Sequence, residues 1–328
     1  MSTAITIQEI ESALSLAQKY LIKTPLIYSP EFSEATGNEI YFKMESFQRT
    51  HAFKARGALN KVSSLSETER GRGVIAASSG NHALGVAYSS ALFGIKATVV
   101  MPVSAPIPKV ELAKSYGARV LFHGNTYDEA LSQARLLARE HGLVLLSSFD
   151  DIKVIAGQGT IALEVLEILP DLDLFIAPIG GGGLVSGLGI VLADLGKKTE
   201  VIGVQAEGAP SMLKSVQAGK RIKLQQISTI ADGIAVQQPG KLNFEYIQRY
   251  IKEIFTVSDE QILEAMFRMF RDMRVVVEPA AAAAPATLLF NKKFQKMDKK
   301  ICCVITGGNV AQDLVERVVR GQLLLQNA

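Results

Sequence analysis

The stretch DLFIAPIGGGGLVSG, residues 173–187, joins a short apolar run to four consecutive glycines. The apolar run predicts a buried strand, and the residues after the glycines predict the start of a helix. Ligands of open α/β sheets bind at such strand ends, where glycine N–H groups and a helix N-terminus favour an anion. Because no Gly-Lys-Ser/Thr follows, this is not a Walker loop. We therefore predict a phosphate-binding loop from Gly180 to Leu184.

A dinucleotide-binding loop is the main alternative for the same segment. The spacing Gly181-x-Gly183-x-x-Ser186 approximates a dinucleotide fingerprint, and Glu207 ends the next apolar run, where a ribose-binding acid would lie. This interpretation predicts a nicotinamide-dependent dehydrogenase. A flexible turn between a strand and a helix is the purely structural alternative.

Strands and helices alternate through the whole chain. In the first half, strand-like runs are separated by helical segments that each close with a glycine (Gly94, Gly117 or Gly142), and they begin at Val74, Ala97, Arg119 and Leu143. In the second half, the runs are DLFIAPI, EVIGVQ, EIFTVS and KICCVIT. EIYFKME and a helix capped by Thr6 precede both sets. This alternation predicts βαβ units and two α/β sheets.

Composition excludes several classes of protein. The 328 residues are 48% hydrophobic and 20% charged, with a net charge of +3 and no basic stripe, which argues against a nucleic-acid partner. No apolar run is long enough to span a membrane, and the N-terminus lacks the pattern of a signal peptide. The adjacent Cys302 and Cys303 fit a reducing compartment, so we expect a cytoplasmic protein.

Three further segments end or follow predicted strands and carry candidate functional groups. Lys54, in SFQRTHAFKARGAL (46–59), has apolar neighbours that would lower its pKa. SSGNH (78–82) offers small polar residues and free N–H groups for a carboxylate. TGGN (306–309) ends the run ICCVI. Taken one at a time, such a lysine is usually a surface residue, SSGNH is as typical of a helix cap, and TGGN is consistent with a tight turn.

Taken together, the ordered motifs resemble the pyridoxal-phosphate-dependent threonine/serine dehydratase and serine racemase family, most closely its short catabolic threonine dehydratases. The motifs are AFKARGAL (52–59), SSGNH (78–82), IAGQGTIALEVL (155–166), GGGGLVSG (180–187), ADG (231–233), VEPAAAA (277–283) and TGGN (306–309). The resemblance implies the tryptophan-synthase-β-like fold type II, in which two open, twisted α/β domains hold the cofactor in the cleft between them. It assigns residues 1–65 and 143–328 to a large cofactor-binding domain and 66–142 to a small one.

The resemblance also implies a role for individual residues. Lys54 looks like the Schiff-base lysine, Ser79 matches the second acid/base of the racemases, and Thr306 takes the place of the group facing the pyridine nitrogen. The implied cofactor-binding residues are Phe53, Lys54, Asn81, Gly180, Gly181, Gly182, Gly183, Leu184, Gly233, Glu278 and Thr306. The implied substrate-binding residues are Ser78, Ser79, Gly80, Asn81 and His82.

The implied activity is deamination of L-threonine and/or L-serine to a 2-keto acid and ammonia, with pyridoxal 5'-phosphate as cofactor. The alternatives within the family are an amino-acid racemase and a 3-hydroxyaspartate dehydratase, and a further one is a non-catalytic amino-acid sensor. We expect a homodimer or homotetramer whose partner is a small hydroxy amino acid. His51-Ala52 replaces the Gly-Ser usual in the family, and Leu213 takes the place of a second acidic metal ligand near Glu207, so we predict no metal site.

Overall fold

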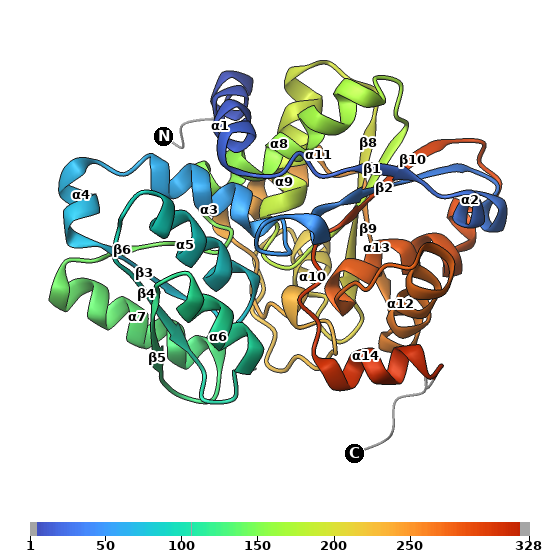
Figure 1. Cartoon of the computed structure of the whole chain (residues 1–328). Helices are drawn as coiled ribbons and strands as arrows, with labels where there is room; N and C mark the ends of the chain where they lie inside the picture. The colour runs from blue at the N-terminus through green and yellow to red at the C-terminus, as the bar shows by residue number, and fades with distance from the viewer. Residues whose placement is uncertain (1–4, 106, 322–328) are drawn as a thin grey trace.

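The computed structural model describes residues 5–105 and 107–321, which are built around two sheets (Figure 1). The larger sheet has six strands. The order across it is β1 (Leu26–Tyr28), β2 (Glu39–Met44), β10 (Lys300–Ile305), β7 (Leu174–Pro178), β8 (Glu200–Ala206) and β9 (Glu253–Val257). Within the described residues, β1 and β2 are antiparallel and the other neighbouring strands are parallel. The N-terminal strand EIYFKME thus joins the larger sheet, and the short edge strand β1 was not predicted.

The smaller sheet has four parallel strands. Their order is β5 (Arg119–Phe122), β4 (Ala97–Met101), β3 (Val74–Ala77) and β6 (Val144–Leu145). Both sets of strands expected from the sequence are confirmed, and with them the α/β class. The strands of this sheet lie between residues 74 and 145, while the extent of the small domain, 66–142, stays a prediction.

Helices cover both sheets. The α-helices are α1 (Ile7–Tyr20), α2 (Pro30–Thr36), α3 (Lys54–Ser63), α4 (Glu67–Arg72), α5 (Asn81–Leu92), α6 (Ile107–Ser115), α7 (Tyr127–His141), α8 (Ile152–Ile168), α9 (Gly183–Asp194), α10 (Ser211–Gln217), α11 (Lys241–Tyr250), α12 (Asp259–Met273), α13 (Pro279–Phe290) and α14 (Gln312–Val319). Short 3-10 turns are η1 (Glu45–Phe47), η2 (Asp232–Ile234) and η3 (Lys292–Phe294). Among the described residues, no helix combines the length and apolar character needed to cross a membrane.

Local signals explain where several helices begin and end. Thr6 caps α1 in a reciprocal capping box with Glu9, as predicted. The three glycines expected to close helices all adopt left-handed backbone, with φ of 64° at Gly94, 83° at Gly117 and 66° at Gly142. These positions favour glycine because a Cβ atom would clash with the following carbonyl oxygen.

Alternating side chains of β10 divide the large core into two layers. Ile301, Cys303 and Ile305 pack with α12 and α13 on one face, whereas Cys302 and Val304 pack with α8 and α9 on the other. The two cysteines therefore point to opposite sides of the sheet, and both are free and buried. The smaller sheet is covered by α3, α5 and α6 on one face and by α7 on the other.

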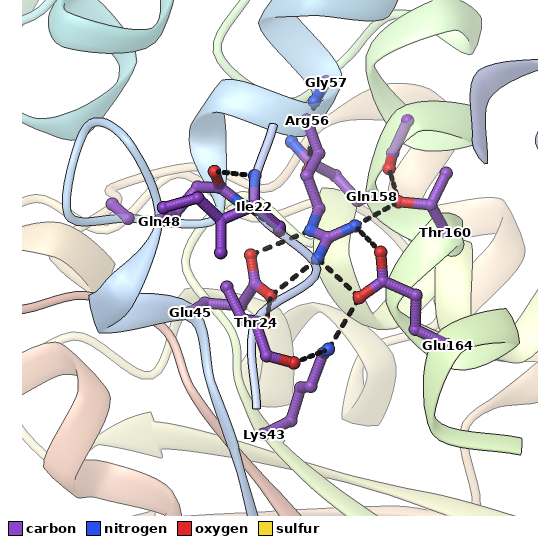
Figure 2. A network of polar contacts seen from close by, with 12 residues as sticks. Ile22, Thr24, Lys43, Glu45, Gln48, Arg56, Gly57, Gln158, Thr160 and Glu164 are labelled. Atoms are coloured by element: carbon purple, nitrogen blue, oxygen red, sulfur yellow. Dashed lines mark hydrogen bonds and ion pairs between the residues drawn. The ribbon is translucent and has the colours of Figure 1, made fainter. Parts of the chain in front are cut away.

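A buried ionic network joins α3 to the larger sheet and to α8 (Figure 2). Arg56 donates to both oxygens of Glu45 (2.8 and 2.9 Å) and to both oxygens of Glu164 (2.8 Å each). Lys43 completes the network, donating to Glu164 and to the carbonyl of Thr24 at 2.6 Å each. Burial alone would lower the pKa of Arg56, but the two carboxylates raise it above its ordinary value.

Removing Arg56 should destabilise the fold strongly. In Arg56→Met, Glu45 and Glu164 stay buried with only Lys43 to balance them, and we expect the free energy of unfolding to fall by about 3–5 kcal/mol. Urea unfolding followed by circular dichroism measures the loss. Lys23→Met is the control, because the Lys23–Glu167 pair is exposed and should contribute less than about 1 kcal/mol. Equal, small losses in both variants would contradict a stabilising role for the network.

Candidate active site

A cavity of about 1210 Å³ opens at the carboxyl ends of strands from both sheets. β3 and β6 of the smaller sheet and β7 and β10 of the larger sheet all end at its wall. The structure brings every sequence-predicted site residue to this cavity: Phe53, Lys54, Ser78, Ser79, Gly80, Asn81, His82, Gly180, Gly181, Gly182, Gly183, Leu184, Gly233, Glu278 and Thr306. Their individual roles stay predictions.

Lys54 is the first residue of α3, and its amine lies inside the cavity. Nζ donates to the carbonyl of Ser148 at 3.0 Å and lies 5.1 Å from the centre of the Phe53 ring. Burial lowers the pKa of Lys54 to about 8, and the negative charge of Glu278 limits that fall. Near neutral pH a fraction of the amine is therefore unprotonated, as nucleophilic or basic chemistry requires.

The glycine loop between β7 and α9 is a tight cradle with no room for side chains. A Cβ atom at Gly181 would lie 2.2 Å from the ring of Phe149, and one at Gly180 would lie 3.2 Å from the backbone of Ile234. Gly182 has a φ of 104°, which side chains rarely tolerate. The loop therefore presents bare backbone to the cavity.

The start of α9 leaves backbone donors available at this loop. The helical hydrogen bonds begin with Ser186 N to Gly182 O at 3.0 Å, so the N–H groups of Gly183, Leu184 and Val185 have no acceptor within the helix. Converging N–H groups at the positive end of a helix favour a phosphate group.

The SSGNH loop follows β3 and turns into α5. The hydroxyl of Ser78 accepts from Gly80 N at 3.1 Å, which shapes the turn, while Ser79 faces the cavity. The ring of His82 is buried, and its Nε2 donates to the carbonyl of Leu146 at 3.3 Å. Burial, with the nearby charge of Lys54, lowers the pKa of His82 to about 3. His82 is therefore neutral at pH 7 and acts on its surroundings as a hydrogen-bonding group.

Asn81 lies in a partly buried chain of polar groups. Its Nδ2 is 2.8 and 2.9 Å from the two carboxylate oxygens of Glu278, and its Oδ1 accepts from Asn309 Nδ2 at 2.9 Å. Burial raises the pKa of Glu278 to about 7, opposed mainly by the hydrogen bond from Asn81. These contacts fix the orientation of the Asn81 amide, which lies in the wall of the cavity.

Thr306 and Gly233 also line the cavity. Thr306 directly follows β10, and its carbonyl accepts from Phe53 N at 3.0 Å, which ties this strand end to the residue before Lys54. Gly233 lies in η2, where a Cβ atom would come within 2.9 Å of Ala280. Both positions depend on close backbone approach between distant segments.

Several lining residues were not found from the sequence. Ser148 and Phe149 follow β6, Tyr127 begins α7, and Lys109 forms an ion pair with Asp232 across the cavity at 2.9 Å. The run SSFDD after the apolar residues 143–146 was an available signal, because polar residues at a strand end are frequent ligands. Glu207, the ribose-binding acid of the dinucleotide alternative, is not among the described residues that line the cavity.

Comparison with known proteins identifies the family. Residues 17–307 match the model of the pyridoxal-phosphate dependent enzymes. The chain is 43% identical over 320 residues to an L-threonine ammonia-lyase of Thermotoga maritima, covering 98% of this chain and 79% of the relative. It is 39% identical over 318 residues to an L-threo-3-hydroxyaspartate ammonia-lyase of Saccharomyces cerevisiae, covering 97% of each. Maize serine racemase has a similar structure, with a TM-score of 0.92, 32% identity and 98% of each chain covered.

The chain therefore belongs to the family of pyridoxal-phosphate dependent enzymes. The residues present fit that cofactor. The glycine cradle excludes side chains and offers N–H donors for a phosphate, and the amine of Lys54, with its lowered pKa, faces the same cavity. The resemblance and the fold type inferred from the sequence are confirmed, and the nicotinamide-dependent alternative is not retained.

Glu278 should make the stability of the cofactor-free protein depend on pH. Its pKa is raised from 4.5 to about 7, so the unfolded chain releases this proton first as the pH rises. Below about pH 4.5, ionisation of Glu278 therefore does not change the free energy of unfolding. Above that pH it lowers the free energy of unfolding, by about 3 kcal/mol at pH 7, and the decrease then stays constant. We expect the unfolding free energy of Glu278→Gln, relative to wild type, to rise by that amount over the same range in urea unfolding.

Glu129→Gln is a control of opposite sign. Hydrogen bonds from Asn125 N and Thr126 N lower the pKa of Glu129, so its stabilisation is present above pH 4.5 and is lost as the pH falls. A pH-independent difference between Glu278→Gln and wild type would contradict the raised pKa of Glu278.

Proposed function

We propose that this enzyme is an ammonia-lyase that converts L-threonine and/or L-serine to the corresponding 2-keto acid and ammonia. The observation that carries the proposal is the placement of the Lys54 amine in one cavity with an anion cradle and a small polar loop suited to a carboxylate. The 43% identity to an L-threonine ammonia-lyase over nearly the whole chain supports the same reaction.

Pyridoxal phosphate, when bound, supplies an electron sink for the electrons released at the substrate Cα. The chain's own residues would hold it: Lys54 at the aldehyde group, residues 180–184 at the phosphate and Asn81 at the phenolic oxygen. Thr306 would face the pyridine nitrogen with a neutral hydroxyl. A neutral partner leaves that nitrogen largely unprotonated, which favours prompt loss of the β-hydroxyl over transamination.

Lys54 moves the proton at Cα in this proposal. A lysine with a pKa of about 8 releases its own proton readily near neutral pH and then accepts one from carbon. The N–H groups and hydroxyls of residues 78–82 hold the substrate carboxylate, so the Cα–H bond is presented to the lysine.

A second candidate activity within the family is racemisation, supported by the structural similarity to serine racemase. Lys54 serves one face of the substrate, and exchange of stereochemistry needs a second acid/base on the other. Ser79 is the candidate because it faces the cavity from the SSGNH loop. One relative is named an L-threo-3-hydroxyaspartate ammonia-lyase, so a panel of test substrates should include that amino acid.

We further propose a homo-oligomer that works in the cytoplasm. Large apolar side chains at one end of the smaller sheet are exposed, namely Ile107 at 75%, Val103 at 60% and Phe122 at 50%, which is typical of a contact surface. The buried, free Cys302 and Cys303 fit a reducing environment. Light scattering of the purified protein measures its oligomeric state.

Replacing Lys54 should abolish the reaction. In Lys54→Ala the nucleophile and the base disappear together, and we expect keto-acid release from L-threonine and L-serine to fall by about three or more orders of magnitude. Mass spectrometry after borohydride reduction should find a phosphopyridoxyl group on the Lys54 peptide of the wild type. Lys114→Ala, on exposed α6, is the control and should keep full activity. Substantial activity in Lys54→Ala would overturn the assignment.

Replacing Ser79 should separate elimination from racemisation. If Ser79 is the second acid/base, Ser79→Ala loses any reaction with D-serine and retains most elimination from the L-amino acids, with somewhat weaker carboxylate binding. Keto-acid production from both enantiomers, in the wild type and the variant, measures this. Equal losses on both enantiomers would mean that Ser79 only positions the substrate.

A further inference from the structure

An ion pair lies in the cavity wall beside the SSGNH loop. Lys109 lies on α6 and Asp232 lies in η2, with 2.9 Å between Lys109 Nζ and Asp232 Oδ2. Both residues line the cavity. The Lys109 amine is also close to the loop itself, since a Cβ atom at Gly80 would be 3.9 Å from Nζ. A positive charge is therefore placed next to the loop that we propose holds the substrate carboxylate.

The two partners of this ion pair differ in burial, and the difference decides which of them can move. The Lys109 side chain is 12% exposed, whereas the Asp232 side chain is 61% exposed. Asp232 can rotate into water at little cost, because exposed ion pairs are weak. The mostly buried ammonium of Lys109 needs an anion beside it, because burial of an unpaired charge is costly. The pair thus consists of a fixed cation and a replaceable anion.

Glu278, at the start of α13, lies within electrostatic range of both partners. Burial is the main cause of its raised pKa, and of the nearby charges Asp232 raises that pKa and Lys109 lowers it. An anion that takes the place of Asp232 beside Lys109 keeps this balance, because one negative group replaces another. The surroundings of Lys109 are therefore already suited to a carboxylate.

Lys223 and Arg135 also line the cavity, but both are exposed. Lys223 is paired with Asp128 at 2.7 Å, and Arg135 lies on α7. Water and salt screen an exposed cation, so it binds an anion weakly. Lys109 differs from both because it combines burial with a position at the SSGNH loop.

We propose that Lys109 binds a second carboxylate, so that the enzyme also accepts hydroxy amino acids that carry a carboxylate on Cβ. Residues 78–82 hold the α-carboxylate of such a substrate, and its second carboxylate displaces Asp232 and pairs with Lys109. With L-threonine or L-serine, Asp232 stays paired with Lys109. This inference rests on the proposed function, because the reaction is the same loss of the β-hydroxyl as water. Hydrolysis of the resulting imine then releases ammonia and, from 3-hydroxyaspartate, oxaloacetate.

The ratio of two specificity constants tests the proposal in the loaded enzyme. The specificity ratio is kcat/KM for L-threo-3-hydroxyaspartate divided by kcat/KM for L-serine or L-threonine, each measured by keto-acid release. We expect this ratio to fall about 10- to 100-fold in Lys109→Met, because a charge-assisted hydrogen bond to the second carboxylate is lost. It should rise about two- to fivefold in Asp232→Asn, because the substrate no longer competes with an anion for Lys109. A general folding defect would not change the ratio in opposite directions.

A double variant and two controls complete the series. Lys109→Met/Asp232→Asn should match Lys109→Met, because Asp232 acts only through Lys109. Lys114→Met is the matched control on the same helix, since Lys114 pairs with Glu111 at 3.2 Å and both side chains are exposed. Arg135→Met removes another cation from the cavity wall. Both controls should keep the specificity ratio within about twofold of the wild type.

Binding without turnover gives a second readout. L-Aspartate has two carboxylates and no hydroxyl group to eliminate, and L-alanine has only one carboxylate. Calorimetric titration of the loaded enzyme with each amino acid measures the contribution of the second carboxylate. We expect the wild type to bind L-aspartate more tightly than L-alanine and Lys109→Met to lose this preference.

The outcomes distinguish this inference from the proposed function. If the wild type releases no keto acid from L-threonine or L-serine, the proposed function fails, whereas a preference for L-aspartate that depends on Lys109 still supports the anion site. If the wild type is active on L-serine or L-threonine but shows neither turnover of 3-hydroxyaspartate nor preference for L-aspartate, the role of Lys109 is overturned. A fall of the specificity ratio in Arg135→Met instead of Lys109→Met, or equal falls in Lys109→Met and Asp232→Asn, would equally overturn it.

Discussion

The buried pair of bidentate contacts made by Arg56 is the interaction on which the site depends. Arg56 lies two residues after Lys54 on α3, and it is held by Glu45, next to β2, and by Glu164 on α8. An ion network without solvent tolerates few alternative arrangements, because any shift leaves a charge buried and unpaired. Groups on the side of α3 away from the cavity thus fix the rotation of this helix about its axis and its position along that axis. Its first residue, Lys54, therefore enters the cavity at a defined point.

Close backbone approach is the second constraint. The cradle at residues 180–183 exists because Phe149, Ile234 and Val236 occupy the space where side chains would lie. The same packing that excludes side chains leaves N–H groups uncovered toward the cavity. Anion binding and tight packing are therefore two results of one arrangement. Phe149, in the segment that joins β6 of the smaller sheet to α8, completes this arrangement.

Burial shifts Lys54, His82 and Glu278 in the cavity toward their neutral forms. It lowers the pKa of Lys54 to about 8 and that of His82 to about 3, and it raises the pKa of Glu278 to about 7. All three shifts have desolvation as their largest cause. Such a site keeps the pKa of its amine close to neutral pH, which suits a residue that must both accept and release a proton.

Local patterns in the sequence determined most of the strands, the helix ends at Gly94, Gly117 and Gly142, and the ordered motifs that contain Lys54 and the glycine loop. These features depend on neighbours within a few residues, so the sequence alone records them. Only the tertiary structure decided the strand order, since β2 pairs with β10 some 260 residues away, as with Ile40 opposite Ile301. It also decided which group accepts from the Lys54 amine, because a backbone carbonyl such as that of Ser148 is common to every residue type and leaves no trace in a side-chain pattern.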